Sequence, residues 1–274
     1  MSKHILSISR LKSSVIAVTK GFACFFLLVI TTAFQATEND TLGPDESDKN
    51  NKKLITLQSD EFHAYTNRVY RQLKYSAGQD SINEKVLALG LRGYIYLKHT
   101  QELNSSQYLT IIDFSKYCNM KRMWVINMIT KKIIFNELVA HGANSGDTYA
   151  KYFSNMHSSN KSSLGFYTTG DLYQGSNDLS LKLNGLEKNF NSNAFTRGIV
   201  IHGASYVNKS IVERKQRIGR SYGCPAVSKD INKQLITTIK GGNCLFVYHP
   251  TLTYLENSKL VNANLYITVE ELNI

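Results

Sequence analysis

The chain has 274 residues and carries 32 Lys and Arg against 21 Asp and Glu, for a net charge of +11. This length accommodates one sizeable hydrophobic core with a smaller accessory segment. The basic balance suits an anionic polymer, although a solvated basic surface explains the charge equally well. The sequence contains no aromatic ribonucleoprotein motif, zinc-finger spacing or basic helix, which argues against a nucleic-acid-binding protein.

Residues 1–36 have the pattern of an export segment. Four basic residues and no acid accompany an uncharged apolar run from Gly21 to Ala33. We interpret the segment as a signal peptide, with an uncleaved membrane anchor as the alternative, because the run is shorter than the roughly 20 residues that span a bilayer. Both interpretations predict an exported protein whose main domain lies in the periplasm or elsewhere in the cell envelope.

The next two segments precede the main domain. Residues 37–58 are rich in Asp, Glu, Asn and Lys with few large apolar side chains, which predicts a disordered linker. Residues 59–103 place apolar side chains at intervals of three and four, and Ser81-Ile82-Asn83-Glu84 resembles a capping box. We therefore expect two helices that cover one end of a β core, with substrate presentation as the alternative role.

From residue 104 onward the pattern changes to short strands. Strand-like segments span residues 108–114, 123–129, 133–139, 165–168, 179–183, 198–202, 244–249 and 266–269. The first three predict a meander, and a helix is expected from Ser228 to Lys240, ended by Gly241-Gly242. The sequence therefore predicts a mostly β main domain over residues 104–274, closer to a sandwich or barrel than to a doubly wound sheet, with a short helical N-terminal segment and a few added helices.

The cysteines leave one reactive candidate. Cys24 falls in the export segment, so Cys118, Cys224 and Cys244 remain in the rest of the chain. An odd number in an exported chain leaves at least one thiol unpaired. Cys118 and Cys244 either pair or are separately buried, and Cys224 is the candidate nucleophile in both cases because of its neighbours.

Cys224 and His202 have the local contexts of a nucleophile and its base. His202 ends a predicted strand, and Cys224 lies in a tight turn. A histidine that accepts the thiol proton makes a cysteine nucleophilic. Gly223 lets the backbone approach a bound carbonyl, and the amides of Tyr222, Gly223 and Cys224 can point at the oxyanion, whereas Pro225 has no amide hydrogen. The structural alternative is a simple turn with a buried thiol and a hydrogen-bonded histidine.

These residues carry a family resemblance. His202-Gly203 followed by Ser221-Tyr222-Gly223-Cys224 resembles the signature of the murein L,D-transpeptidase catalytic domain, and the phrase from Gly219 to Val227 is similar to one branch of that family. Upstream segments resemble the same branch: Val139–Gly142, Phe153–Asn155, Ser162–Tyr167 and Leu183–Glu187. Together the matching segments cover about residues 105 to 250 and imply the β-sandwich or barrel-like fold of that family.

The resemblance implies roles for the motif residues. Cys224 would be acylated, His202 would act as the base, and the carbonyl of Gly203 would orient the imidazole. Ser221 would help to shape the pocket, together with Gly223 and Tyr222. The family usually has a histidine at position 222 and, at position 226, an arginine that meets a substrate carboxylate. Alanine stands at position 226 here, which leaves recognition of the donor stem without its usual residue.

Other side chains are candidates for binding substrate. Arg220, Arg217 or Arg214 could replace the missing arginine, because a guanidinium pairs with a carboxylate through two hydrogen bonds, although each could equally be a solvated loop charge. His141, Asn155 and Tyr167 are further candidates, with a structural hydrogen bond, a turn or the core as the alternative for each. Zinc held by His141, His202 and Cys224 is a weak alternative, because no close pair of ligands lies on one element.

The resemblance implies a peptidoglycan L,D-transpeptidase. Such an enzyme forms a thioester with a tetrapeptide stem, releases D-alanine, and passes the acyl group to an amine of another stem or of a wall-linked protein. No metal or organic cofactor is required. With water as acceptor, the same site would be an L,D-carboxypeptidase or a hydrolase. A non-catalytic wall-binding module and an unrelated thiol hydrolase are the rival hypotheses, and the residues specify neither the acceptor nor the oligomeric state.

Overall fold

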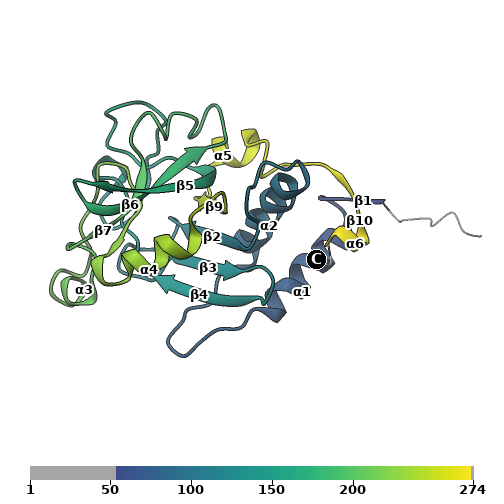
Figure 1. Ribbon diagram of the computed structural model, residues 1–274, viewed down its shortest axis with the longest axis horizontal. Helices are drawn as coiled ribbons and strands as arrows, with labels where there is room; N and C mark the ends of the chain where they lie inside the picture. Colours follow the sequence, from purple (N-terminus) through teal and green to yellow (C-terminus); the bar gives the residue numbers. More distant parts are fainter. Residues whose placement is uncertain (1–53, 273–274) are drawn as a thin grey trace, which may run out of the picture. The chain divides into compact units, whose positions relative to one another are not determined.

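The computed structural model describes residues 54–272, which are organised around an eight-stranded sheet (Figure 1). The strand order is β4-β3-β2-β9-β5-β6-β7-β8. The strands are β2 (Tyr108–Asp113), β3 (Met123–Asn127), β4 (Lys132–Glu137), β5 (Gly165–Gly175), β6 (Asp178–Gly185), β7 (Val200–Ala204), β8 (Ala226–Ser228) and β9 (Cys244–Tyr248). The predicted export segment and residues 37–53 of the predicted linker lie outside the described residues.

The sheet mixes antiparallel and parallel pairs. The predicted meander is confirmed, because β2, β3 and β4 pair antiparallel in sequence. β9 returns between β2 and β5, parallel to the first and antiparallel to the second. β5, β6 and β7 continue antiparallel, and β8 ends the order by pairing parallel to β7. The strands β7 and β8, which flank the predicted catalytic residues, are therefore direct neighbours.

The two outermost strands are joined beyond the regular ladder. Ala140, just after β4, bridges Ala226 of β8, and its amide donates to the Ala226 carbonyl at 2.8 Å. A second bridge follows between Gly142 and Ser221. These contacts bring the chain after β4 against the far end of the strand order, so that the sheet is nearly closed. The prediction of a mostly β, barrel-like main domain with a few added helices is thus confirmed.

The N-terminal helices α1 (Asp60–Gln72) and α2 (Glu84–His99) confirm the predicted helical segment. Helix α2 packs against β2 and β9, and two glycines permit its close approach. A methyl group added at Gly93 would lie 2.2 Å from the ring of Phe166, and one at Gly90 would lie 2.9 Å from Ile111. The cap prediction at Ser81 was wrong: Asn83 accepts from the amide of Val86 and begins the helix.

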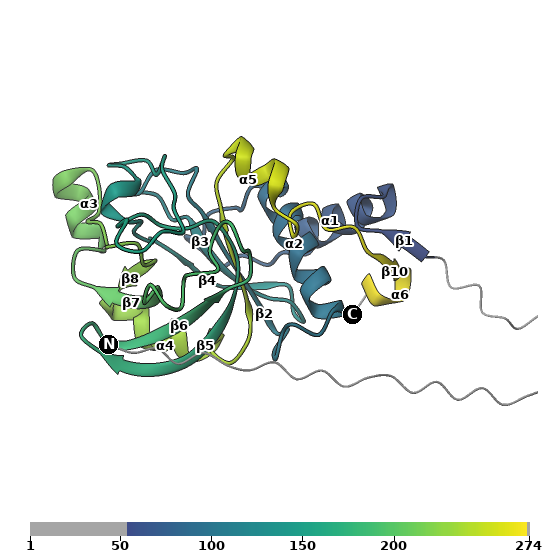
Figure 2. The ribbon, with the colours of Figure 1, turned by 90° about the horizontal axis from the view of Figure 1, so that it is seen from above.

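The ends of the described chain form a second, two-stranded sheet. β1 (Leu54–Thr56) pairs antiparallel with β10 (Tyr266–Thr268), which is followed by α6 (Val269–Leu272). The predicted linker over residues 37–58 was therefore wrong at its C-terminal end, because Ile55 and Leu57 are buried. Figure 1 and Figure 2 place this sheet and α1 at the end of the domain away from β7 and β8.

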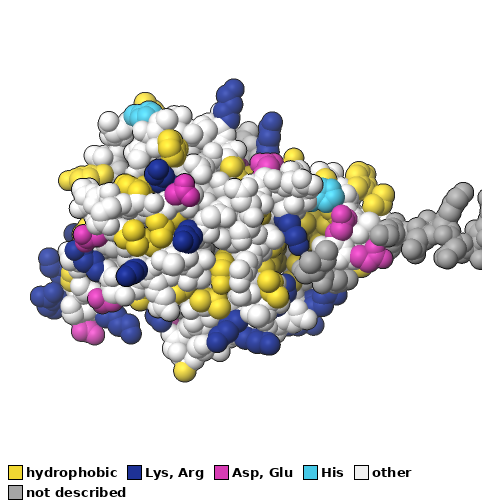
Figure 3. Space-filling view, viewed as in Figure 1, with side chains coloured by type: hydrophobic (Ala, Val, Ile, Leu, Met, Phe, Trp, Pro, Cys, Tyr) yellow, Lys and Arg dark blue, Asp and Glu magenta, His cyan; other side chains and the backbone are white. Residues whose placement is uncertain are grey.

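The remaining helices follow the second half of the sheet. They are α3 (Lys209–Lys215), α4 (Lys229–Ile239) and α5 (Leu252–Asn257), with a short 3-10 helix at Ala143–Ser145. Helix α4 begins after Ser228 and ends before Gly241, as predicted, and packs against β6, β7 and β8. Helix α3 was not predicted; Figure 3 shows basic side chains gathered where Figure 1 places it, and its sequence holds Lys209, Arg214 and Lys215. Among the described helices, none has both the length and the apolar composition needed to cross a membrane.

Candidate active site

The strands β7 and β8 bring the predicted base and nucleophile into one region. His202 on β7 pairs with Ala226 on the parallel strand β8, and Cys224 stands two residues before Ala226. The predicted strand start at residue 198 was two residues early, since Gly198 has a φ of +67° and β7 begins at Val200. Gly198 instead forms the turn that precedes β7 and faces the thiol of Cys224.

His202 is held in one orientation by its own strand. Its side chain is buried, and Nδ1 lies 3.1 Å from the carbonyl oxygen of Gly203. Because a carbonyl can only accept, Nδ1 carries the proton and Nε2 keeps its lone pair. Burial lowers the pKa of His202, although the Gly203 hydrogen bond opposes this effect. The expected contact between His202 and the Gly203 carbonyl is therefore present; it sets the tautomer of the imidazole, while burial favours its neutral form.

Gly203 has a further local role in packing. A methyl group at this position would lie 3.0 Å from Cβ of Asn232 on α4, so the glycine lets the helix approach β7 closely. Asn232 is buried, and its amide donates to Leu179 O at 2.8 Å. The strand that carries His202 thus pairs with β6 on one side and β8 on the other, and α4 packs against it.

The thiol of Cys224 is half-buried and points at the turn before β7. Its Sγ donates to the carbonyl of Gly198 at 3.6 Å, and within the described residues no hydrogen bond joins it to His202. Burial raises the pKa of the thiol, while the Val200 amide and the charge of Arg197 lower it. With the pKa of His202 lowered and that of Cys224 raised, the resting site favours a neutral thiol beside a neutral imidazole over a preformed ion pair.

The turn around Cys224 is fixed by side-chain hydrogen bonds. Ser221 Oγ donates to the Cys224 carbonyl at 2.6 Å and accepts from the Gly223 amide at 3.1 Å. Ser162 Oγ donates to the Gly223 carbonyl at 3.1 Å. In this geometry the Gly223 amide, one of the predicted oxyanion donors, is hydrogen-bonded to Ser221 Oγ. The amides of Tyr222 and Cys224 make no hydrogen bond within the described chain and remain the candidate donors.

Gly223 is required by the turn for a steric reason. Its φ of +125° is a conformation that side chains with a Cβ rarely adopt. A methyl group here would also lie 2.9 Å from the carbonyl oxygen of Lys161. Tyr222, by contrast, is 82% exposed, so its side chain projects from the turn into solvent.

The other side of the turn is paired with the segment after β4. Ser221 donates its amide to His141 O at 3.0 Å, and Ala143 donates its amide to Ser221 O at 2.7 Å. His141 itself is buried, with Nδ1 accepting from Arg122 at 2.8 Å and Nε2 lying 3.3 Å from Gly146 O. Burial, followed by the charge of Arg122, lowers the pKa of His141 to about 4. Both ring nitrogens have hydrogen-bond partners, which favours a structural role for His141. Neither nitrogen is left to coordinate the zinc ion of the alternative hypothesis.

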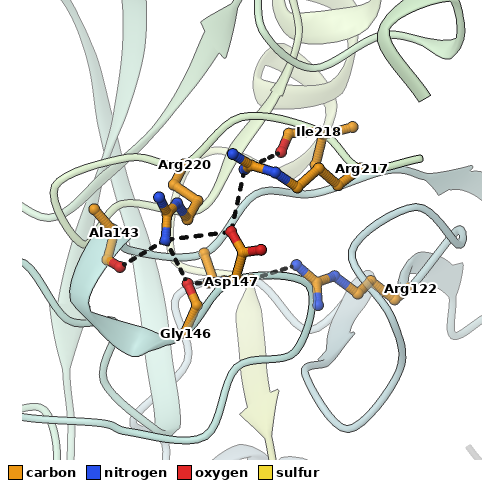
Figure 4. Close-up of polar contacts among 8 residues, drawn as sticks. Arg122, Ala143, Gly146, Asp147, Arg217, Ile218 and Arg220 are labelled. Atoms are coloured by element: carbon orange, nitrogen blue, oxygen red, sulfur yellow. Dashed lines mark hydrogen bonds and ion pairs between the residues drawn. The ribbon is translucent and has the colours of Figure 1, made fainter. Parts of the chain in front are cut away.

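Arg217 and Arg220 share one carboxylate beside this segment (Figure 4). NH1 of each guanidinium lies 3.5 Å from Oδ1 of Asp147. Arg220 also donates to the carbonyls of Ala143 and Gly146, at 3.3 and 3.0 Å. Two cations therefore face a single, largely exposed acid, which leaves one uncompensated positive charge four residues before Cys224. Arg214 lies on α3, where its Nε donates to Ser210 O at 3.2 Å.

Asn155 and Tyr167 have structural partners. The Tyr167 side chain is 1% exposed, and its hydroxyl donates to the carbonyl of Ser163 at 2.9 Å. Asn155 ties its loop to residues 188–193, accepting from the Asn193 amide at 2.9 Å and donating to Lys188 O at 3.2 Å. These placements favour the core and turn alternatives over substrate contact.

Arg197 is the residue that sequence reasoning missed. It precedes Gly198, and its NH2 lies 3.4 Å from the position that a methyl group on Gly223 would occupy. Its four hydrogen-bond acceptors all lie between residues 154 and 163. No local motif marks it, and the one available signal was its position immediately before the strand predicted over residues 198–202.

The remaining cysteines are separate from this region. Cys118, Cys224 and Cys244 are all free, and Cys118 and Cys244 are buried. The alternative of a Cys118–Cys244 disulfide is therefore wrong for this structure. Among the described residues, no group of three His, Cys, Asp or Glu side chains is arranged to hold a metal ion.

Comparison with known proteins gives a family match. Residues 78–248 match the family described as L,D-transpeptidase catalytic domain, which is more than half of the chain. The matched segment includes α2 as well as the eight-stranded sheet. The chain matches no curated protein.

Similar solved structures come from several bacteria. An L,D-transpeptidase from Mycobacterium smegmatis is 10% identical, with 53% of this chain and 60% of that chain covered and a TM-score of 0.35. The helical cell shape determining protein Pgp2 from Campylobacter jejuni is 13% identical, with 58% and 57% covered and a TM-score of 0.34. An L,D-transpeptidase from Xylanimonas cellulosilytica is 15% identical, with 68% and 91% covered and a TM-score of 0.30. The chain spans about three fifths of the first structure's length, and with similarities this low the assignment rests on the match over residues 78–248.

Proposed function

The chain belongs to the L,D-transpeptidase catalytic domain family, and we propose that it is an exported peptidoglycan L,D-transpeptidase with Cys224 as nucleophile and His202 as base. The observation that carries the proposal is the pairing of β7 with β8. His202, whose Nε2 has no hydrogen bond within the described chain, lies on β7, and the half-buried Cys224 lies on the turn that leads into the neighbouring strand β8. A general base and a nucleophile so placed are the two groups that acyl transfer requires.

The first half-reaction forms a thioester. Sγ of Cys224 attacks the carbonyl carbon that joins the L-configured centre of diaminopimelate, or its equivalent, to the terminal D-alanine of a tetrapeptide stem. The C–S bond forms and the C–N bond breaks. His202 Nε2 takes the thiol proton and passes it to the departing amine, so D-alanine leaves neutral at its nitrogen and the imidazole is regenerated.

The second half-reaction returns the enzyme to its starting state. The amine of another stem, or of a wall-linked protein, attacks the thioester carbonyl while His202 removes a proton from that amine. The C–N bond forms, the C–S bond breaks, and the proton returns to the thiolate. If water replaces the amine, the same site releases a free carboxylate and acts as an L,D-carboxypeptidase or hydrolase.

The thiol must change partner before it reacts. In the resting site Sγ is hydrogen-bonded to Gly198 O at 3.6 Å. Rotation about the Cα–Cβ bond of Cys224, from one staggered rotamer to another, would break the hydrogen bond to Gly198 and move Sγ away from the turn before β7. We place the reactive rotamer toward β7, where Nε2 of His202 can accept the proton. The amides of Tyr222 and Cys224 then supply the donors for the oxyanion.

Recognition of the donor carboxylate falls to Arg220 and Arg217. Alanine stands at position 226, where the family usually has an arginine. Arg220 and Arg217 converge on the carboxylate of Asp147, at 3.5 Å each, so the pair already binds the functional group that the stem presents. A substrate carboxylate would share the pair with Asp147 or displace it, because both guanidiniums have further N–H groups.

Covalent labelling tests the proposal. The purified protein is incubated with a carbapenem, and the adduct is mapped by peptide mass spectrometry, with Cys224→Ser as the matched control. We expect one adduct on Cys224 in the native protein, none in the variant, and loss of terminal D-alanine from tetrapeptide muropeptides only with the native protein. No adduct together with unchanged muropeptides would refute the proposal.

The same preparations separate the rival functions. A wall-binding module would sediment with isolated peptidoglycan equally well as native protein and as Cys224→Ser, without any change in the muropeptides. An unrelated thiol hydrolase would cleave casein and leave muropeptides intact. A carboxypeptidase would yield tripeptide stems, whereas a transpeptidase would yield cross-linked dimers.

A further inference from the structure

Arg197 is a half-buried cation that has only neutral hydrogen-bond partners. Its guanidinium donates to four oxygens on one loop: Ser154 O at 2.7 Å, Lys161 O at 2.7 Å, Ser159 Oγ at 3.2 Å and Ser163 Oγ at 3.3 Å. No carboxylate of the described residues forms an ion pair with it. Carbonyl and hydroxyl dipoles solvate the guanidinium without cancelling its charge, so its field extends to whatever lies beside it.

Two independent observations show that Arg197 lies close to the proposed nucleophile, Cys224. The next residue in the chain, Gly198, provides the carbonyl that accepts the Cys224 thiol. In addition, NH2 of Arg197 lies 3.4 Å from where a Cβ on Gly223 would be, and Gly223 directly precedes Cys224. The guanidinium therefore packs against the turn that presents the thiol.

Arg197 also joins that turn to the loop of residues 154–163. The carbonyl of Lys161 accepts from Arg197 and lies 2.9 Å from the same Cβ position of Gly223. Ser162, the next residue, donates its hydroxyl to the Gly223 carbonyl at 3.1 Å. The loop, the guanidinium and the turn thus form one packed unit.

We propose that Arg197 is a positioning residue for Cys224: its charge stabilises the thiolate, and its planar fork holds residues 154–163 against the reactive turn. The inference rests on the proposed function in taking Cys224 as the nucleophile. Arginine suits both tasks because it keeps its charge when half-buried and donates in several fixed directions, which a lysine does not.

The comparison with the other arginines of the site supports this assignment. Arg217 and Arg220 share Asp147, so part of their charge is cancelled. Arg197 has no such partner among the described residues, and its charge lowers the pKa of Cys224, second to the Val200 amide among the effects that oppose burial. Burial lowers the pKa of Arg197, and the interactions with Tyr167 and Cys224 oppose this effect by raising it. Once Cys224 is ionised, its thiolate would thus take the place of the missing carboxylate.

The other titratable groups to consider near Cys224 are Tyr206, which interacts with the thiol, Tyr222 two residues before it, and His202, the base in the proposed function. Burial lowers the pKa of His202, which makes it neutral at pH 7. Burial, followed by Cys224 and Tyr222, raises the pKa of Tyr206 to about 12, so this phenol also stays neutral. Within the described chain, Arg197 is therefore the cation that acts on the thiol between about pH 7 and pH 10.

The test is the pH dependence of Cys224 alkylation in the full chain. Rates of iodoacetamide labelling are measured by peptide mass spectrometry for the native protein, Arg197→Gln and Arg197→Lys. For Arg197→Gln we expect the midpoint of the profile to move up by about one pH unit, so that labelling below the midpoint slows by about tenfold. Arg197→Lys keeps the charge and should move the midpoint by less than half as much. Because lysine cannot make the four hydrogen bonds of the guanidinium, amide hydrogen exchange over residues 154–163 should accelerate in this variant.

Arg92 provides the matched control. It is also half-buried, donates to a backbone carbonyl, that of Val261 at 3.1 Å, and packs over the ring of Phe62. Arg92→Gln should lower stability in urea, as Arg197→Gln does, and leave the alkylation midpoint unchanged. Coincident profiles for Arg197→Gln and the native protein, or an equal displacement in Arg92→Gln, would overturn the inference.

A second measurement needs no variant and covers the case in which Arg197→Gln does not fold. A nearby cation attracts an anionic reagent, so the rate ratio of iodoacetate to iodoacetamide should be higher for native Cys224 than for free cysteine at the same ionic strength, and it should fall with added salt. A ratio at or below that of free cysteine refutes the inference. Neither measurement uses a wall substrate. Failure of the Arg197 inference is therefore distinguishable from failure of the proposed function, which the carbapenem and muropeptide experiment tests.

Discussion

His202 stands directly opposite Ala226 across the parallel strands β7 and β8. In a parallel pair, residues at equal register lie side by side, so Cys224, two residues before Ala226, enters β8 next to the strand of His202. The proposed base is thus fixed by regular secondary structure, whereas the proposed nucleophile lies on the turn that leads into the neighbouring strand.

His202 should give activity an acid limit below the ordinary histidine range. Because burial lowers its pKa, the imidazole stays neutral, and able to accept a proton, at pH values where a free histidine is protonated. The rate of carbapenem acylation should therefore fall only below about pH 6.5, and His202→Gln should reduce it by about 10²–10⁴-fold at all pH values. A limit at or above pH 6.5 would contradict the burial argument.

Cys224 should be the one thiol of the described residues that reacts in the folded protein. Cys118 and Cys244 are 1% and 0% exposed, and burial raises the pKa of Cys244 further. Brief native alkylation followed by peptide mapping should label Cys224 alone, and the other two should label only after unfolding in urea. Native labelling of Cys118 at a comparable rate would show that its surroundings open readily.

Gly223→Ala should destabilise the domain more than Gly78→Ala. Both glycines have positive φ, at +125° and +75°, so both variants bear the conformational cost of about 1 kcal/mol. Only at Gly223 would the methyl group also meet a backbone oxygen, Lys161 O at 2.9 Å, whereas nothing lies within 4 Å at Gly78. Urea unfolding should give a loss at Gly223 that exceeds the loss at Gly78 by about 1–2 kcal/mol. Equal losses would mean that the loop of residues 154–163 yields to the added group.

Arg220→Gln should raise KM for a tetrapeptide stem by about tenfold and change kcat little. Loss of a charge-assisted hydrogen bond costs about 1.5–3 kcal/mol, and a bond made equally in the ground and transition states appears in KM. Asp147→Asn should lower KM, because it removes the internal competitor for the same guanidiniums. Arg71→Gln, at the exposed end of α1, is the control. An unchanged KM in Arg220→Gln would leave Arg220 as a structural residue.

The elements that sequence predicted well are those whose signals are local. Helix α4 lies between Ser228, which caps it, and Gly241, whose φ is +81°. Both signals lie within one or two residues of the helix end. Helix α1 likewise begins after Ser59, which accepts from the Phe62 amide at 3.3 Å. The meander followed from strand alternation with a short connection.

The features that sequence missed depend on distant partners. β1 pairs with a strand more than 200 residues away, so its short apolar run looked like the end of a linker. Arg197 finds its acceptors 34 to 43 residues earlier in the chain, and no spacing rule marks such a pair. The occupied amide of Gly223 was missed because its acceptor, Ser221 Oγ, had been assigned to the pocket instead of to the turn.

The bridge between Ala140 and Ala226 has a consequence for acceptor choice. It joins β8, which follows Cys224, to the chain after β4, so the turn that carries Cys224 cannot move outward unless this hydrogen bond breaks. Accommodation of bulky or slender nucleophiles at the proposed site must therefore come from the loop of residues 154–163, which packs against the same turn. Sequence changes in that loop could then redirect the product of the proposed reaction while the backbone that carries Cys224 stays in place.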